Sequence, residues 1–134
     1  MSLSIKVRLL SILPKLMLIG MRGLEDVLKE FPEATTRSML LRLFDDRGGE
    51  MCIWLGFENE QPAAREVECR NPPFATTEVS MHIDVFLRVL KGKLDFRSAY
   101  LYDLIDIRSN DGLPASYHLI LWSAFWDRVR KLLE

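Results

Sequence analysis

The stretch that decides the fold runs from residue 77 to residue 113 and reads TEVSMHIDVFLRVLKGKLDFRSAYLYDLIDIRSNDGL. Its first residues alternate apolar and polar side chains, which predicts a strand over 77–83 with one face buried. We expect Asp84 to cap a short helix over 85–90. Gly92 follows just past its end, at the position where a left-handed backbone is usually needed. The stretch therefore opens with a strand that leads directly into a short helix.

A second short helix is predicted over 95–102, followed by a strand over 104–108. Because this strand is joined to the preceding one through helices, we expect the two to run parallel. The closing segment, 113–134, is predicted to be a helix with Pro114 in its first turn. Its apolar face is wider than one sheet face needs and consists of Tyr117, Ile120, Leu121, Trp122, Ala124, Phe125, Trp126, Val129, Leu132 and Leu133. A ligand, a lipid surface or a partner subunit is expected to cover the excess.

Three more strands are predicted upstream, over 37–44, 50–58 and 64–70. The segment 45–49, Asp-Asp-Arg-Gly-Gly, is typical of a hairpin turn. These strands therefore form an antiparallel meander. The segment 71–74, Asn-Pro-Pro-Phe, cannot continue a paired strand because each proline removes a backbone donor. The chain is expected to leave the sheet there and to re-enter it through a crossover.

The N-terminal part of the chain is strongly apolar. An amphipathic helix is predicted over 15–31, and the apolar run over 9–21 is too short to span a bilayer. We expect this run to dock on the domain or to lie against a lipid surface. The whole chain, 1–134, is predicted to be one domain, with an apolar helical segment over 1–32 and the sheet and helices over 35–134. The predicted fold class is α+β: a five-stranded mixed, mostly antiparallel sheet, in the order α-β-β-β-crossover-β-α-β-α, covered on one face by helices.

The composition is that of an ordinary globular domain. Of the 134 residues, 49% are hydrophobic and 28% are charged. Eighteen basic residues against nineteen acidic residues leave a net charge of −1. No positive field is therefore available to attract a phosphate backbone, and we expect no nucleic-acid partner.

Few residues suit chemistry. His82 and His118 are the only histidines, and neither belongs to a metal-binding motif. Cys52 and Cys69 are not arranged as a Cys-x-x-Cys pair, and we expect both to be small apolar side chains in a reducing, cytoplasmic setting. No catalytic residue, metal or cofactor is predicted. A thiol nucleophile paired with one of the histidines remains a weaker alternative.

The residues from 77 to 113 resemble the sterol carrier protein type-2 family. The positions that carry the resemblance are Phe86, Leu87, Gly92, Lys93, Leu94, Asp95, Ala99, Tyr100, Ile105, Ile107, Asn110, Gly112 and Leu113. The predicted first hairpin, over 35–59, is similar to the family in pattern only. Phe96 stands where proline is common, and Asp103 and Ser109 stand where glycines usually flank the last strand. The resemblance implies a sheet covered by helices that enclose an apolar tunnel for a lipid, without catalysis.

The predicted function is that of a non-catalytic domain holding a sterol, fatty acyl or isoprenoid lipid for carriage or presentation. We expect the lipid to contact Leu16, Ile19, Leu41, Ile53, Met81, Phe86, Leu87, Leu90, Tyr100, Ile105, Tyr117, Leu121, Trp122, Phe125 and Trp126. The alternative is an accessory interaction subunit, for example in quinone biosynthesis, whose apolar helix faces bind a partner protein or a membrane surface. A homodimer would use the same faces.

Overall fold

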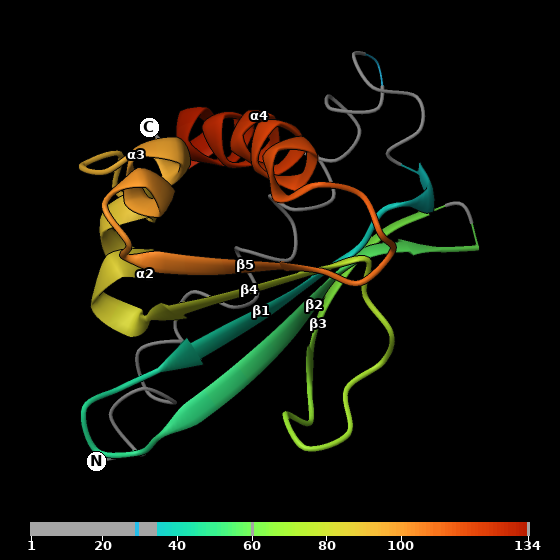
Figure 1. Ribbon diagram of the computed structural model, residues 1–134, viewed down its shortest axis with the longest axis horizontal. Helices are drawn as coiled ribbons and strands as arrows, with labels where there is room; N and C mark the ends of the chain where they lie inside the picture. Colours follow the sequence, from blue (N-terminus) through green and yellow to red (C-terminus); the bar gives the residue numbers. More distant parts are fainter. Residues whose placement is uncertain (1–28, 30–34, 60, 134) are drawn as a thin grey trace.

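The fold is α+β, as predicted, and is built on a five-stranded mixed sheet of order β3-β2-β1-β4-β5. The computed structural model describes residues 29, 35–59 and 61–133. The predicted helix over 15–31 lies outside them, apart from Lys29. The strands are β1 (Met39–Phe44), β2 (Glu50–Glu58), β3 (Gln61–Val67), β4 (Thr77–His82) and β5 (Ile105–Ser109), and the described helices are α2 (Ile83–Leu90), α3 (Phe96–Leu101) and α4 (Ala115–Leu133). Figure 1 shows α2, α3 and α4 on the same side of the sheet.

The predicted meander and crossover are both confirmed. β2 pairs antiparallel with β1 and with β3. In the turn between β1 and β2, a carboxylate oxygen of Asp45 accepts hydrogen bonds from the backbone N–H groups of Arg47 and Gly49. After β3 the chain crosses over so that β4 pairs in parallel with β1 at the centre of the sheet. β3 ends three residues earlier than predicted, which leaves Cys69 outside the strand.

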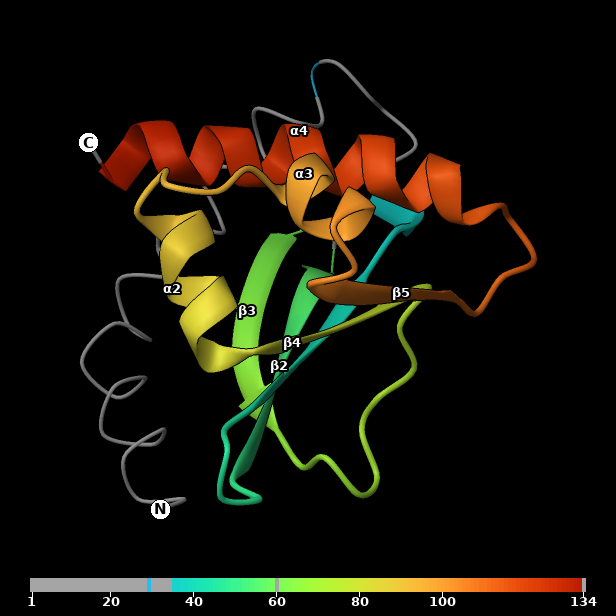
Figure 2. The same cartoon turned by 60° about the vertical axis from the view of Figure 1, so that its left-hand side comes forward.

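The predicted direction of β5 is wrong, because β5 runs antiparallel to β4. A parallel connection needs a crossover long enough to return the chain to the start of the first strand. The segment between β4 and β5 is long enough for that, but it is divided between two short helices, α2 and α3, of eight and six residues, which do not return the chain to the start of β4. They bring the chain back beside the end of β4, where Ile105 pairs with Met81. Figure 2 shows both helices near that end of the sheet.

The N-cap of α2 is His82, and the prediction that Asp84 fills this position is wrong. Nδ1 of His82 accepts a hydrogen bond from the backbone N–H of Asp84 at 3.0 Å. The helix begins directly at the end of β4, so the last strand residue is the one in position to cap it. At the other end the predicted left-handed glycine is confirmed, since Gly92 has φ +74°.

The main core lies between the sheet and the three described helices. The sheet contributes alternate residues of each strand, among them Met39, Leu41 and Leu43 of β1, all fully buried. The helices contribute aromatic rings, chiefly from α4. This is the buried face that the strand alternation predicted.

The opposite face of the sheet is not wholly exposed to solvent, although the alternation of apolar and polar residues predicted that only one face would be buried. Leu40, Cys52, Trp54 and Ala75 form a second, smaller buried cluster there. The segment over 68–76 covers these residues, and the indole N–H of Trp54 donates to the backbone carbonyl of Phe74 at 3.1 Å. β2 is therefore buried on both faces from Met51 to Gly56.

Candidate functional site

The residues predicted to contact a lipid converge on the layer between the sheet and the helices. Ten are buried in it: Leu41, Ile53, Met81, Phe86, Leu90, Ile105, Leu121, Trp122, Phe125 and Trp126. Three are partly buried and pack against it: Leu87, Tyr100 and Tyr117. Leu16 and Ile19 lie outside the described residues. We call this set of described residues the apolar layer.

Trp126 occupies the middle of the aromatic part of the apolar layer. Its ring lies edge-to-face with Phe86 of α2 at 5.7 Å and with Phe125 at 5.0 Å, and it stacks on Phe96 of α3 at 6.4 Å. The side chain is 3% exposed. Its indole N–H is buried and has no hydrogen-bond partner among the described residues. Because an unpaired buried donor costs free energy, this N–H is available to an acceptor that the described part of the chain does not supply.

The wide apolar face of α4 is only partly directed at the sheet. Leu121, Trp122, Phe125 and Trp126 are buried, whereas Ile120 is 54% exposed. The described side chains of α4 therefore divide into a stripe that packs on the core and an apolar position that faces outward.

A buried polar cluster adjoins the apolar layer at Trp122, and sequence reasoning missed it. His118 of α4 is fully buried. Its Nδ1 lies 2.5 Å from the hydroxyl oxygen of Thr77 and 3.1 Å from a guanidinium nitrogen of Arg37. Its Nε2 lies 2.9 Å from the hydroxyl of Ser109 and 3.3 Å from a carboxylate oxygen of Asp111.

The neighbours of His118 fix its protonation. A guanidinium can only donate, so Nδ1 of His118 must accept, and the ring proton sits on Nε2. Burial and the positive charge of Arg37 both lower the pKa of His118 below its ordinary value. Burial alone would raise the pKa of Asp111, but hydrogen bonds from Arg37, the backbone of Leu113 and Ser109 together outweigh it and lower this pKa to about 2. The cluster therefore holds the neutral His118 beside the ion pair between Arg37 and Asp111.

This arrangement does not form a nucleophile and its base. The Nε2–H of His118 donates toward Ser109, so it cannot take the proton from that hydroxyl. The hydroxyl of Ser109 in turn donates to Asp111 at 3.1 Å. The cluster instead fixes α4 on the sheet. Besides His118, Trp122 of the same helix contacts Thr77 of β4: its indole N–H donates to the threonine hydroxyl at 3.0 Å. The one sequence signal that could have placed His118 on the buried face of α4 is its position three and four residues before Leu121 and Trp122, and that spacing does not reveal its partners.

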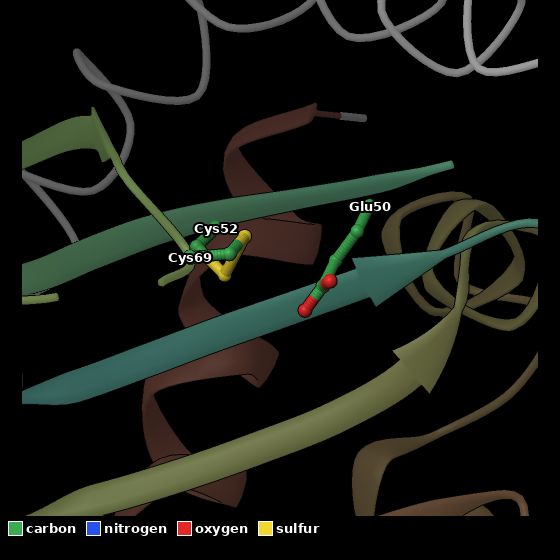
Figure 3. Close-up of side chains that lie close together, drawn as sticks. All are labelled: Glu50, Cys52 and Cys69. Carbon is green, nitrogen blue, oxygen red and sulfur yellow. A yellow bond between two sulfur atoms is a disulfide. The ribbon is translucent and has the colours of Figure 1, made fainter. Parts of the chain in front are cut away.

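The other histidine and the cysteines also have structural partners. Nε2 of His82 lies 2.9 Å from a carboxylate oxygen of Asp46, while its Nδ1 caps α2. Cys52 and Cys69 are joined by a disulfide, with their Cα atoms 5.4 Å apart, as Figure 3 shows. The expectation that both are separate apolar side chains, and the weaker alternative of a thiol nucleophile, are therefore wrong. The bend after β3 swings Cys69 back toward β2, within the range that a disulfide requires.

The chain shares its fold with sterol carrier protein 2. No family model and no curated protein sequence matches it. A sterol carrier protein 2 from Yarrowia lipolytica, in its apo form, superposes with a TM-score of 0.57 at 12% identity, over 84% of this chain and 87% of that one. A crystal structure of sterol carrier protein 2 gives 0.56 at 18%, over 87% and 94% of the two chains. A conserved hypothetical protein from Thermus thermophilus gives 0.58 at 18%, over 85% and 80%.

At these identities the likeness shows the fold alone. The sequence resemblance had implied this fold, and the superpositions confirm it. Among the described helices, none combines the length and the hydropathy needed to cross a membrane.

Proposed function

We propose that this chain binds one lipid molecule, a sterol, fatty acyl or isoprenoid lipid, within the apolar layer, for carriage or presentation and without catalysis. The observation that carries the proposal is Trp126, whose indole N–H is buried among aromatic rings and has no acceptor in the described part of the chain. A hydroxyl or carboxylate on an otherwise apolar ligand supplies that acceptor. The shared fold supports the same interpretation, because the structures it resembles are named as sterol carriers.

Apolar contacts alone give useful affinity in such a site. Burying one methylene group contributes about 0.8 kcal/mol, so a chain of about 16 carbons gains roughly 12 kcal/mol before costs. The association itself costs roughly 4 to 15 kcal/mol. The two quantities are comparable, so a single well-placed hydrogen bond shifts the affinity noticeably.

Further partners and the location also remain proposals. Leu101 and Tyr102, at the end of α3, are 70% and 72% exposed, and they offer a small apolar contact with a membrane surface during lipid transfer.

A cytoplasmic location is compatible with the proposal only if the Cys52–Cys69 disulfide can open, because stable disulfides belong to oxidising compartments. Thiol labelling of the protein in intact cells distinguishes the two states.

The test is native mass spectrometry of the freshly purified chain, followed by organic extraction and identification of what is released. We expect a stoichiometric lipid, and a stripped protein that takes up a fluorescent fatty acid. An empty protein that also fails to take up the fatty acid contradicts lipid binding. If that empty protein is a dimer or co-purifies with a defined partner, the interaction-subunit alternative replaces it.

A further inference from the structure

The sheet has an open corner where β3 ends. The last pair between β2 and β3 joins Cys52 to Val67, so Met51 and Glu50 of β2 extend past it without a partner in β3. A hollow of about 690 Å³ lies at this corner, lined by Glu50, Met51, Cys52, Glu66, Val67, Glu68, Cys69 and Arg70. Both sulfur atoms of the disulfide therefore belong to residues that line a solvent-facing hollow.

Three possible metal ligands meet there. One carboxylate oxygen of Glu50 and the sulfurs of Cys52 and Cys69 all lie within 4.8 Å of one another. Figure 3 shows the Glu50 side chain next to the disulfide. Zinc holds thiolate sulfur at about 2.3 Å and carboxylate oxygen at about 2.0–2.2 Å. Side-chain rotation is therefore enough to bring the three atoms around one ion once the disulfide has opened.

The surrounding charges favour a cation. Three acidic residues, Glu50, Glu66 and Glu68, line the hollow, against Arg70 in its lining and Arg42 beside it. Arg42 of β1 holds Glu50 in place, since one of its guanidinium nitrogens lies 2.6 Å from a carboxylate oxygen of Glu50 and 3.3 Å from the carbonyl oxygen of Cys69. Zn²⁺ with two thiolates and one carboxylate has one net negative charge, which Arg42 offsets.

We propose that Cys52, Cys69 and Glu50 form a zinc site in the reduced protein, and that the disulfide and the bound metal exclude each other. A dithiol reductant entering the hollow transfers two electrons and two protons to the disulfide and is itself oxidised to a disulfide. Zn²⁺ then binds both sulfurs and displaces their two protons, and a water molecule from the hollow completes the tetrahedral coordination. Two thiolates select zinc over magnesium or calcium, which prefer oxygen ligands.

The test uses the full chain, reduced with a dithiol, freed of reductant by anaerobic gel filtration, and titrated with Co²⁺ as a spectroscopic stand-in for Zn²⁺. We expect one Co²⁺ per chain with a thiolate-to-cobalt charge-transfer band, displaced by Zn²⁺. The oxidised protein should show no such band. Glu50→Gln should weaken binding at least about tenfold. Its matched control, Glu68→Gln, removes a carboxylate from a residue that lines the same hollow but is not in the ligand cluster, and should stay within about twofold of the wild type.

Several results would overturn the proposal. One is the absence of the thiolate-to-cobalt band in the reduced wild type. Another is equal weakening of Co²⁺ binding by Glu50→Gln and Glu68→Gln, which would mean that the ion is attracted to the acidic hollow in general and not bound by Glu50. Far-UV circular dichroism of each sample guards against unfolding. If Cys52→Ala does not fold, Cys69→Ala, whose side chain is only partly buried, takes its place and should also abolish the band. Binding retained in the folded cysteine variant would also rule the site out.

Discussion

Nδ1 of His118 lies 2.5 Å from the hydroxyl oxygen of Thr77, although 41 residues separate them in sequence. The contact joins the first residue of β4 to the last helix. Since Trp122 donates to the same hydroxyl, one threonine holds two residues of α4. The position of α4 over the apolar layer therefore depends on a hydrogen-bonded cluster as well as on apolar packing, and the cluster contains a titratable group.

The first prediction concerns pH. The pKa of His118 is lowered by burial and by Arg37. The His118 ring therefore stays neutral in the native protein at a pH where the same ring takes up a proton in the unfolded chain. The unfolded state then binds more protons, and the free energy of unfolding decreases as the pH falls below the ordinary histidine value of 6.5 toward the lower native pKa. Thermal unfolding followed from about pH 7 to about pH 5 should show this loss.

His118→Gln should flatten that slope while lowering stability at neutral pH by about 1–3 kcal/mol, because buried partners of the ring lose hydrogen bonds. Asp111 does not confuse the result: its lowered pKa means that its contribution is lost only as the pH falls from 3.8 toward about 2. Ser116→Ala, at an exposed position of the same helix, should keep the wild-type slope. A wild type whose stability is constant between about pH 7 and pH 5 would contradict the prediction.

The second prediction concerns Trp126 and ligand uptake. Trp126→Phe keeps an aromatic ring in the apolar layer but removes the unpaired N–H. If that group donates to the ligand, the affinity for a fluorescent fatty acid should fall by about twofold to tenfold, which corresponds to one net hydrogen bond. Trp54→Phe, in the smaller cluster on the other face of the sheet, is the matched control and should bind as the wild type does. Equal affinity in all three proteins would show that the indole N–H does not contact the ligand.

The third prediction concerns the disulfide. It joins residues 17 positions apart. In the chain-entropy view, closing a loop of this length stabilises the native state by about 3 kcal/mol. Denaturant unfolding of the Cys52→Ala, Cys69→Ala double variant, without added metal, should show a loss of this size. Wild-type protein in excess reductant and metal chelator should unfold at the same denaturant concentration as the variant, and a variant as stable as the oxidised wild type would refute the estimate.

The fourth prediction concerns Gly56 of β2. A Cβ atom built there would lie 2.6 Å and 2.8 Å from ring atoms of Trp54 and 3.1 Å from Cβ of Ser38. The Trp54 ring cannot yield freely, since it is 7% exposed and its indole N–H is bonded to Phe74. Gly56→Ala should therefore cost about 1–3 kcal/mol, measured by denaturant unfolding. Combining it with Trp54→Leu, which makes room, should cost less than the sum of the two single changes; strict additivity would mean that the clash is absent.

The strands were predictable from sequence because alternation is a local signal. β2 was placed with its observed bounds, and the hairpin turn expected over 45–49 joins β1 to β2. The direction of β5 was not predictable in this way, since it depends on where two short helices return the chain. The cap of α2 was misassigned by two residues because His82 and Asp84 both carry side chains that can accept a hydrogen bond.

The candidate site also has a part that local sequence patterns predict and a part that they do not. The apolar layer was predictable from helix and strand periodicity, whereas the polar cluster joins Arg37, Thr77, Ser109 and His118, which no spacing rule relates. The disulfide depends on the register between β2 and β3 and on the bend after Val67, and neither can be read from two isolated cysteines. Contacts between distant residues thus account for what the sequence did not reveal.

The parallel pairing of β1 with β4 at the centre of the sheet also has a consequence for how the chain folds. Met39 pairs with Thr77, so the central pair can form only after the intervening meander and crossover segment have been synthesised. Until then the second edge of β1, a strand whose residues are mostly apolar, has unpaired backbone groups. We therefore expect a transient species with an exposed apolar edge during synthesis, before β4 has emerged from the ribosome, and aggregation at that stage will compete with folding.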